Sequence, residues 1–130
     1  METIRMCCAV IRWNDRIFVS QRGYGDLDEG WEFPGVIYEE GEYGPSRLVE
    51  AIVEEFETMV EVQDKLCTVE YDSQDQHVIM DAYWCKVKKG YLEGVDSDIM
   101  HWLRPLELDY VTWLPADRQI VDQIQASFAA

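Results

Sequence analysis

Seven glutamates and a single basic residue, Arg47, lie between residues 39 and 57. So dense a run of like charge repels itself, and a bound divalent cation is one reason for a protein to tolerate it. Glu54 and Glu55 are an adjacent pair in this run, and carboxylate oxygens are ligands that Mg²⁺ and Mn²⁺ prefer. The composition therefore indicates either a metal site or a solvated, acidic surface helix.

The same segment has the periodicity of an amphipathic helix over residues 47–58. The Gly-Pro-Ser at residues 44–46 favours a helix start, because proline suits the first turn. At about 100° per residue, four apolar side chains fall on one side: Leu48, Ile52, Phe56 and Met59. Glu55 falls among them, with Glu54 on the nearer flank. A bare carboxylate is costly to bury, so the pattern predicts that Glu55 is neutral, paired or bound to a metal.

Residues 31–60 resemble the Nudix box of the Nudix hydrolases, especially in the MutT-like branch. The tract Trp-Glu-Phe-Pro-Gly at residues 31–35 is similar to the strand and turn that precede the box. Glu42 after Gly41 matches the first glutamate of the box, Ile52 matches an aliphatic position, and residues 54–55 match its Glu-Glu pair. The resemblance implies an α/β (α+β) fold, the Nudix α/β/α sandwich with a mixed β-sheet between the box helix and a C-terminal helix.

The chain also departs from that box. Val36 stands where the first glycine belongs, Glu50 where an arginine belongs, and residues 57–58 replace a closing glycine and aliphatic residue. Ala51 replaces a glutamate that is a metal ligand or the general base in the family. Glu50 is a poor substitute, because it lies about 100° further round the helix. Loss of a general acid or base typically costs about 10²–10⁴-fold, so the pattern predicts impaired activity.

Length, composition and charge limit the class of protein. The chain has 130 residues, 48% of them apolar, and a formal net charge of −15, which predicts one domain over residues 1–130. A general nucleic-acid binder needs a basic face, so we expect no nucleic-acid polymer as a partner. No apolar run is long enough to span a bilayer and no signal peptide opens the chain. We therefore expect no membrane association and a cytoplasmic location.

Apolar runs and turn signals predict the remaining elements. Residues 6–11 and 16–20 are expected to form a hairpin around Asn14 and Asp15. Residues 66–71 and 78–87 are expected to be strands joined by a turn at 73–76, with the second strand central and buried. A short strand at 101–103 and a final helix from residues 113–117 to about residue 126 complete the fold.

The cysteines and one histidine are expected to be structural. The cysteines show no Cys-x-x-Cys spacing and are Cys7, Cys8, Cys67 and Cys85. We expect buried, reduced thiols rather than disulfides or a metal site. His77 has no second His or Cys at ligand spacing, which favours a structural hydrogen-bonding role over zinc binding.

The resemblance implies further site residues outside the box. Arg22 matches by position an arginine that reaches substrate phosphate in MutT-like proteins, and its forked donors suit that task. Asp96 lies six residues before Trp102, at the spacing of a glutamate that acts as a further metal ligand or base in the family. The alternatives are a surface arginine beside an acidic loop for Arg22 and an ordinary acidic loop for Asp96, with Asp98 as a competing candidate.

The final helix carries a candidate for base recognition. Leu-Pro-Ala-Asp at residues 114–117 resembles the tract that opens the last helix of MutT-like pyrophosphohydrolases, where the residue that matches Asp117 can touch the nucleobase. An aspartate accepts hydrogen bonds from exocyclic amines. Asp117 is also well placed to cap the helix or to interact with its dipole. Phe33 and Gln76 are assigned to the substrate side by the same resemblance.

The resemblance as a whole predicts an enzyme. It implies Mg²⁺-dependent hydrolysis of a nucleoside triphosphate, CTP- or dCTP-like or oxidised dGTP-like, to the monophosphate and pyrophosphate. The implied metal ligands are Gly35 (through its carbonyl), Glu54, Glu55 and Asp96, with Mn²⁺ as a substitute ion, and the last three are the implied catalytic residues. The alternatives are a nucleotide-binding module that has lost efficient hydrolysis and an acidic interaction protein without a nucleotide role. Many relatives are dimers, so a homodimer is an open expectation.

Overall fold

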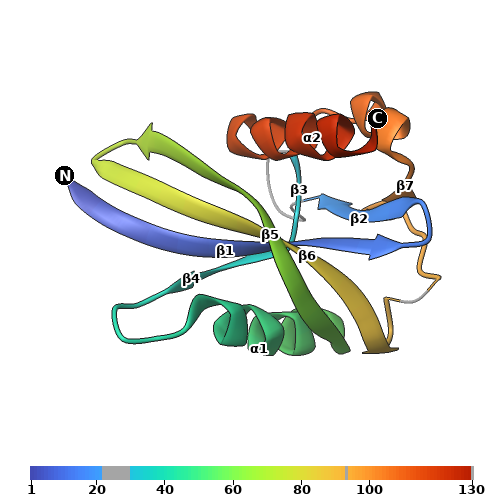
Figure 1. The fold of residues 1–130 in the computed structure, drawn as a ribbon, viewed down its shortest axis with the longest axis horizontal. Coiled ribbons are helices and arrows are strands. Elements are labelled where there is room, and N and C mark those ends of the chain that lie inside the picture. Colours follow the sequence, from blue (N-terminus) through green and yellow to red (C-terminus); the bar gives the residue numbers. More distant parts are fainter. Residues whose placement is uncertain (22–29, 93, 130) are drawn as a thin grey trace.

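The structure is a computed structural model that describes residues 1–21, 30–92 and 94–129. A mixed β-sheet lies between two long helices (Figure 1). Helix α1 (Gly44–Phe56) covers one face of the sheet and helix α2 (Pro115–Phe128) covers the other. A 3₁₀ helix, η1 (Pro105–Tyr110), precedes α2. The predicted α/β/α sandwich is therefore confirmed.

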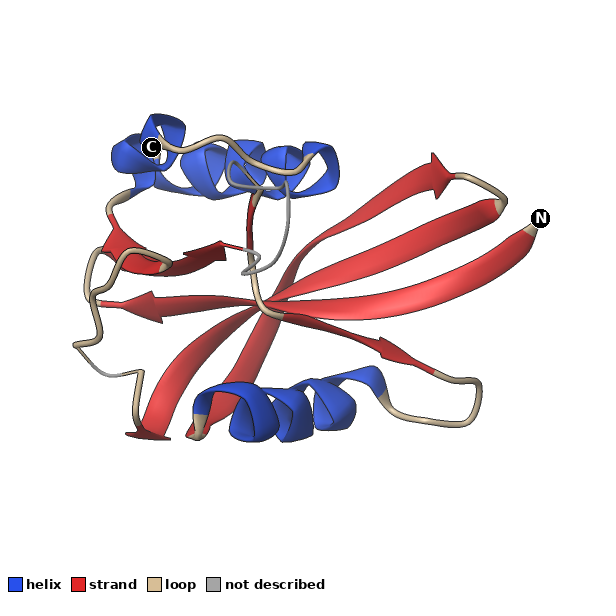
Figure 2. Cartoon of the chain, turned by 180° about the vertical axis from the view of Figure 1, so that it is seen from behind, coloured by secondary structure: helices blue, strands red, loops and turns tan. Residues whose placement is uncertain are grey.

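The sheet is built around strands β1 (Glu2–Trp13) and β6 (Gln76–Gly90), which are parallel neighbours. Its main order is β3-β2-β1-β6-β5, with β4 also paired to β1 and β7 to β2, and every pairing except that of β1 with β6 is antiparallel. The other strands are β2 (Arg16–Gln21), β3 (Trp31–Glu32), β4 (Gly35–Tyr38), β5 (Thr58–Ser73) and β7 (Met100–Leu103). Figure 2 shows the strands fanning out from the middle of the sheet, with a helix on either side.

Side chains alternate along β1, as expected for a strand buried on both faces. Cys7, Ala9 and Ile11 pack on the α1 side, and Cys8 and Val10 pack on the α2 side. All five are almost completely buried. The continuous apolar run that predicted this strand thus reflects two hydrophobic clusters, one under each helix.

Helix α1 ends earlier than its periodicity predicts. Leu48, Ile52 and Phe56 are buried as predicted, but the helix stops at Phe56. Glu57 adopts the left-handed conformation, with φ 51° and ψ 40°, and its N–H donates to the Val53 carbonyl at 3.0 Å. Strand β5 begins at the next residue, so the prediction that Met59 belongs to the core stripe is wrong, and its side chain is 49% exposed.

The four cysteines are free thiols, and Cys7, Cys8 and Cys85 are buried. Burial raises the pKa of the Cys7 thiol to about 11 and that of the Cys85 thiol to about 12. These thiols therefore stay protonated at neutral pH, as expected for structural residues. No helix in the described part of the chain combines the length and the apolar character that crossing a bilayer requires.

Candidate active site

A pocket of about 540 Å³ is lined by residues from both helices and from six strands. Strand β1 pairs with β4 up to Cys8 and Gly35, and with β2 only from Arg12 onward. Residues 33–34 cross the interval between these pairings, where the Ala9 N–H donates to the Pro34 carbonyl at 2.8 Å. Because β1 exchanges β4 for β2 as its antiparallel partner between these positions, the sheet is interrupted there, next to the pocket.

Glu55 contributes a carboxylate to this pocket from the last turn of α1, and Glu32 contributes another from β3. Glu55 is exposed to solvent, so the expectation that it lies inside the apolar stripe is wrong. Its long side chain carries the charge out of the stripe and into the pocket. Partial desolvation, and secondarily the negative charge of Glu32, raise the pKa of Glu55 above its ordinary value. Two like charges thus share one region of the pocket.

This pair of carboxylates fits a divalent cation. Within residues 1–21, 30–92 and 94–129, no three His, Cys, Asp or Glu side chains are already assembled as a metal site. Mg²⁺, however, usually keeps several waters and uses one or two carboxylates together with substrate phosphates. Glu32, Glu55 and the predicted ligand Gly35 line the same pocket. A cation there would stabilise the ionised form of Glu55, which desolvation and, secondarily, the charge of Glu32 disfavour.

The other two predicted ligands do not line the pocket. Glu54 is exposed on α1. The Asp96 carboxylate lies 2.7 Å from Nδ1 of His101, whose ring stacks on Trp31 at a centroid distance of 5.1 Å and an interplanar angle of 20°. The structure therefore brings Glu55 and Gly35 together and leaves Glu54 and Asp96 outside the pocket lining.

Asp117 and Phe33 also line the pocket. Asp117 is only 7% exposed, and its Oδ1 accepts a hydrogen bond from the Phe33 N–H at 3.2 Å. The Phe33 ring stacks on Trp113, with centroids 4.8 Å apart and planes 17° apart. Asp117 lies in the first turn of helix α2, whose N-cap residue Leu114 supplies no side-chain cap, so the helix-dipole interpretation of Asp117 stands beside its hydrogen bond to Phe33.

Two predicted substrate residues, Arg22 and Gln76, remain. Arg22 lies outside the described residues. Gln76 begins β6 at the outer end of the hairpin, and its amide nitrogen is 3.4 Å from the Glu2 carboxylate. Gln76 is absent from the pocket lining.

The structure adds residues that the sequence pattern did not suggest. Tyr71, Asp72 and Ser73, at the end of β5, also line the pocket. Asp72 is also held by His77 Nδ1 at 2.7 Å, while Nε2 of the same ring lies 2.9 Å from Glu70. This confirms the predicted hydrogen-bonding role of His77, which clamps a strand of the pocket wall.

Helix α1 presents a methyl group where the family pattern has a carboxylate. Ala51 is half-buried one turn before Glu55, and a residue four positions earlier lies on the same helix face. Glu50 is exposed and its carboxylate is 3.6 Å from the Arg47 guanidinium. Glu50 is therefore engaged on the outer surface of α1 and does not line the pocket.

Comparison with known proteins gives the fold but no close relative. No protein-family model matches the sequence, and no curated protein matches it. The solution structure of the E. coli ORF135 protein superposes with a TM-score of 0.81 at 22% identity, covering 99% of this chain and 93% of that one. The MutT protein of methicillin-resistant Staphylococcus aureus 252, a Nudix hydrolase, gives 0.72 at 28% identity, covering 98% and 99%. A MutT Nudix hydrolase from Burkholderia pseudomallei gives 0.77 at 18% identity, covering 95% and 98%.

Proposed function

We propose that this chain, whose fold is the MutT-like Nudix fold, hydrolyses a nucleoside triphosphate to the monophosphate and pyrophosphate with the help of Mg²⁺. The fold supports hydrolysis of substrates linked to a nucleoside diphosphate in general. Two features of the pocket lining support the narrower proposal. They are the like-charged carboxylates of Glu32 and Glu55 and the buried acceptor Asp117.

The partly desolvated Glu55 carboxylate, with the carboxylate of Glu32 in the same pocket lining, supports the metal most directly. Free polyphosphate would be repelled by these carboxylates, whereas a polyphosphate that brings Mg²⁺ would be attracted. Glu55, Glu32 and the Gly35 carbonyl are the groups that would hold the ion, and the family resemblance would add Glu54 and Asp96. When bound, the ion would neutralise phosphate charge and lower the pKa of an attacking water. The protein groups then position the phosphates, as in other phosphoryl transfers.

Asp117 would select the base. Its carboxylate is fixed by the Phe33 N–H and lies in the pocket lined by Phe33 and Met80. A carboxylate accepts hydrogen bonds and cannot donate them while ionised. A base with an exocyclic amine, as in CTP or dCTP, satisfies it, and so would the amine of an oxidised guanine. A base that presents only carbonyl oxygens would leave two acceptors facing each other.

Pyrophosphate release from a panel of nucleoside triphosphates, with Mg²⁺, with Mn²⁺ and with EDTA, tests the proposal. We expect turnover that requires the metal and favours a base carrying an amine. Turnover that is equal with EDTA would contradict the metal role, and equal turnover of uridine and cytidine nucleotides would contradict the role of Asp117.

One observation favours a second candidate function. Ala51 places a methyl group beside Glu55, where the family pattern has a ligand or base, so the pocket could retain a nucleotide without hydrolysing it efficiently. Calorimetry with a non-hydrolysable nucleotide analogue and Mg²⁺ separates the two functions. Binding without turnover would make the chain a nucleotide-binding module.

A further inference from the structure

Ser20, on strand β2, is a buried polar residue that lines the candidate active site. Only 9% of its surface is exposed, yet its hydroxyl forms no hydrogen bond with any residue in the ranges 1–21, 30–92 and 94–129. In this part of the chain every fully enclosed polar side-chain atom has a hydrogen-bond partner, so the Ser20 Oγ must be open to the pocket. Buried polar groups are normally paired, and an exception needs an explanation.

The other two buried polar side chains of the described residues have structural partners. Thr58 Oγ1 donates to the Phe56 carbonyl at 2.9 Å and accepts from the Leu92 N–H at 2.9 Å. The Asp117 carboxylate accepts the backbone N–H described above. Both groups therefore hold segments of the fold together, whereas the hydroxyl of Ser20 joins none of the described segments.

Ser20 lies on the α1 side of the sheet. Along β2, Ile17 and Val19 belong to the hydrophobic cluster under α2, and Phe18 belongs to the cluster under α1. Because side chains alternate between the two faces of a strand, Ser20 projects to the same side as Phe18.

The two carboxylates of the pocket lie on that side as well. Glu32 is the register partner of Ser20 in the pairing of β2 with β3, and directly opposed side chains share a face, with Cβ atoms about 4.5–5.5 Å apart. Glu55 comes from the last turn of α1. All three residues line the pocket, so Ser20 brings a hydroxyl to the region of the two carboxylates.

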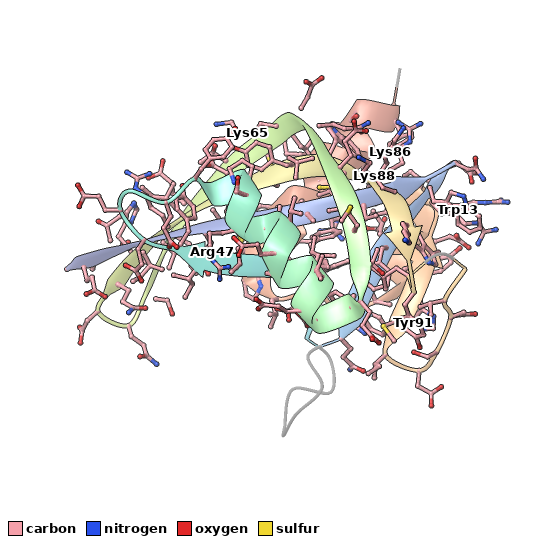
Figure 3. All side chains as sticks on the ribbon, turned by 90° about the horizontal axis from the view of Figure 1, so that it is seen from below. Trp13, Arg47, Lys65, Lys86, Lys88 and Tyr91 are labelled. Carbon is pink, nitrogen blue, oxygen red and sulfur yellow. The ribbon has the colours of Figure 1, made fainter. Side chains whose placement is uncertain are left out.

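The hydroxyl is a hydrogen-bond donor in a region of acceptors. Ionised carboxylates and the Gly35 carbonyl can only accept hydrogen bonds, whereas a serine can donate one. Figure 3, which looks onto α1, labels four basic residues that lie away from the C-terminal end of this helix: Arg47, Lys65, Lys86 and Lys88. None of these four lines the pocket, so they do not supply a donor beside Glu55.

We propose that the Ser20 hydroxyl donates a hydrogen bond to a phosphate oxygen of the metal-bound nucleoside triphosphate, an inference that rests on the proposed function. Glu32 and Glu55 would hold the cation, and Ser20 binds a phosphate oxygen that the cation does not take. Ser20 is therefore a substrate-binding residue for which the fold itself has no need. This role explains why a hydroxyl is buried at this position without a structural partner.

Two measurements on Ser20→Ala test the proposal: calorimetric titration with a non-hydrolysable CTP analogue in Mg²⁺, and urea unfolding. The affinity for the analogue should fall about tenfold or more, because a hydrogen bond to a charged group is lost. The affinities for cytidine, which has no phosphate, and for Mg²⁺ alone should stay unchanged. The urea midpoint should be equal or higher, because the variant removes a buried polar group that is unpaired in the described part of the chain.

Thr58→Val is the matched control, because it removes a buried hydroxyl that has two structural hydrogen bonds. It should lower the urea midpoint and leave the affinity for the analogue unchanged, which is the reverse of the pattern expected for Ser20→Ala.

Three results would overturn the role of Ser20 and leave the proposed function standing. The first is equal affinity of the wild type and Ser20→Ala for the analogue. The second is a lower urea midpoint in Ser20→Ala, which would make the hydroxyl structural. The third is a weaker affinity of this variant for Mg²⁺ alone, which would make the hydroxyl a ligand of the ion. No affinity of the wild type for the analogue would overturn both proposals.

Discussion

The backbone N–H of Phe33 donates a hydrogen bond to the Asp117 carboxylate at 3.2 Å, although 84 positions separate the two residues in the sequence. This bond joins the end of β3 to the first turn of α2. Both residues line the candidate active site. The contact therefore joins two segments of the pocket lining that are distant in the sequence.

Two substitutions of Asp117 should separate its contribution to the stability of the protein from its contribution to base selection. Asp117→Asn keeps an oxygen acceptor for Phe33 and adds an amide donor, so it should unfold close to the wild type in urea and shift turnover toward carbonyl-bearing bases. Asp117→Ala leaves a buried N–H without its acceptor, which costs about 1–3 kcal/mol. Equal stability of the alanine variant would contradict the role of this bond in the wall.

Replacing Glu57 by glycine should stabilise the protein by about 1 kcal/mol, because a side chain is disfavoured in the left-handed region and glycine is not. Glu57 has φ 51° at the end of α1. Urea unfolding measures the change. Glu50→Gly is the matched control, since glycine in an exposed helix interior should destabilise by about 1 kcal/mol. A loss of stability in Glu57→Gly would contradict the description of this helix end.

The raised pKa of Glu55 sets a pH dependence whose sign is defined. Because the folded pKa lies above the unfolded one, ionised Glu55 opposes folding, and its unfavourable contribution develops as pH rises toward and through the folded pKa. In EDTA, Glu55→Gln should therefore gain stability relative to the wild type as pH rises through that interval, while Mg²⁺ affinity falls. Calorimetric titration that gave the same Mg²⁺ affinity for both proteins would place the ion elsewhere.

The contribution of His77 to the pH dependence of stability should have the opposite sign to that of Glu55. Hydrogen bonds to Asp72 and then Glu70 raise the pKa of His77 above its ordinary value, so its contribution to stability is fully present below the unfolded pKa. It is lost as pH rises through the folded pKa. His77→Gln should flatten this part of the stability profile, measured by urea midpoints across the titration range. An unchanged profile in the variant would show that the clamp does not contribute to stability.

Restoring the missing box glutamate should raise activity. Ala51→Glu places a carboxylate one turn before Glu55 on α1 and should increase Mg²⁺-dependent pyrophosphate release by about 10²–10⁴-fold, the typical range for a general base. Ala51→Gln is the control, because it has similar size and no charge. No gain in Ala51→Glu would mean that other departures, such as Val36, have reshaped the loop.

Local hydrophobic periodicity predicted most helices and strands, because the pattern of apolar residues reflects which faces of each element are buried. Strand β1 was predicted from an uninterrupted apolar run because both its faces are covered, and α1 from one apolar stripe. Strand β5 was predicted only from residue 66, yet it begins at Thr58. Irregularities of register between Val62 and Cys67 break its alternation, so the first half did not resemble a strand.

The site was only partly predictable, because a pocket combines residues that periodicity treats separately. Glu55, Gly35, Phe33 and Asp117 were assigned to the site from the motifs, and all four line the pocket. A helical wheel gives the direction of Cβ, not the reach of a long side chain, and so it placed the Glu55 carboxylate in the core. Residues 71–73 reach the pocket through the sheet order, which no local pattern contains.

The most direct test of the account is ³¹P NMR of the products formed from the preferred nucleoside triphosphate by the wild type and by Glu55→Gln. The account predicts equal amounts of nucleoside monophosphate and pyrophosphate, formed only with Mg²⁺ or Mn²⁺ and lost in the Glu55→Gln variant. Orthophosphate and a nucleoside diphosphate as products, or an equal rate in Glu55→Gln, would contradict it.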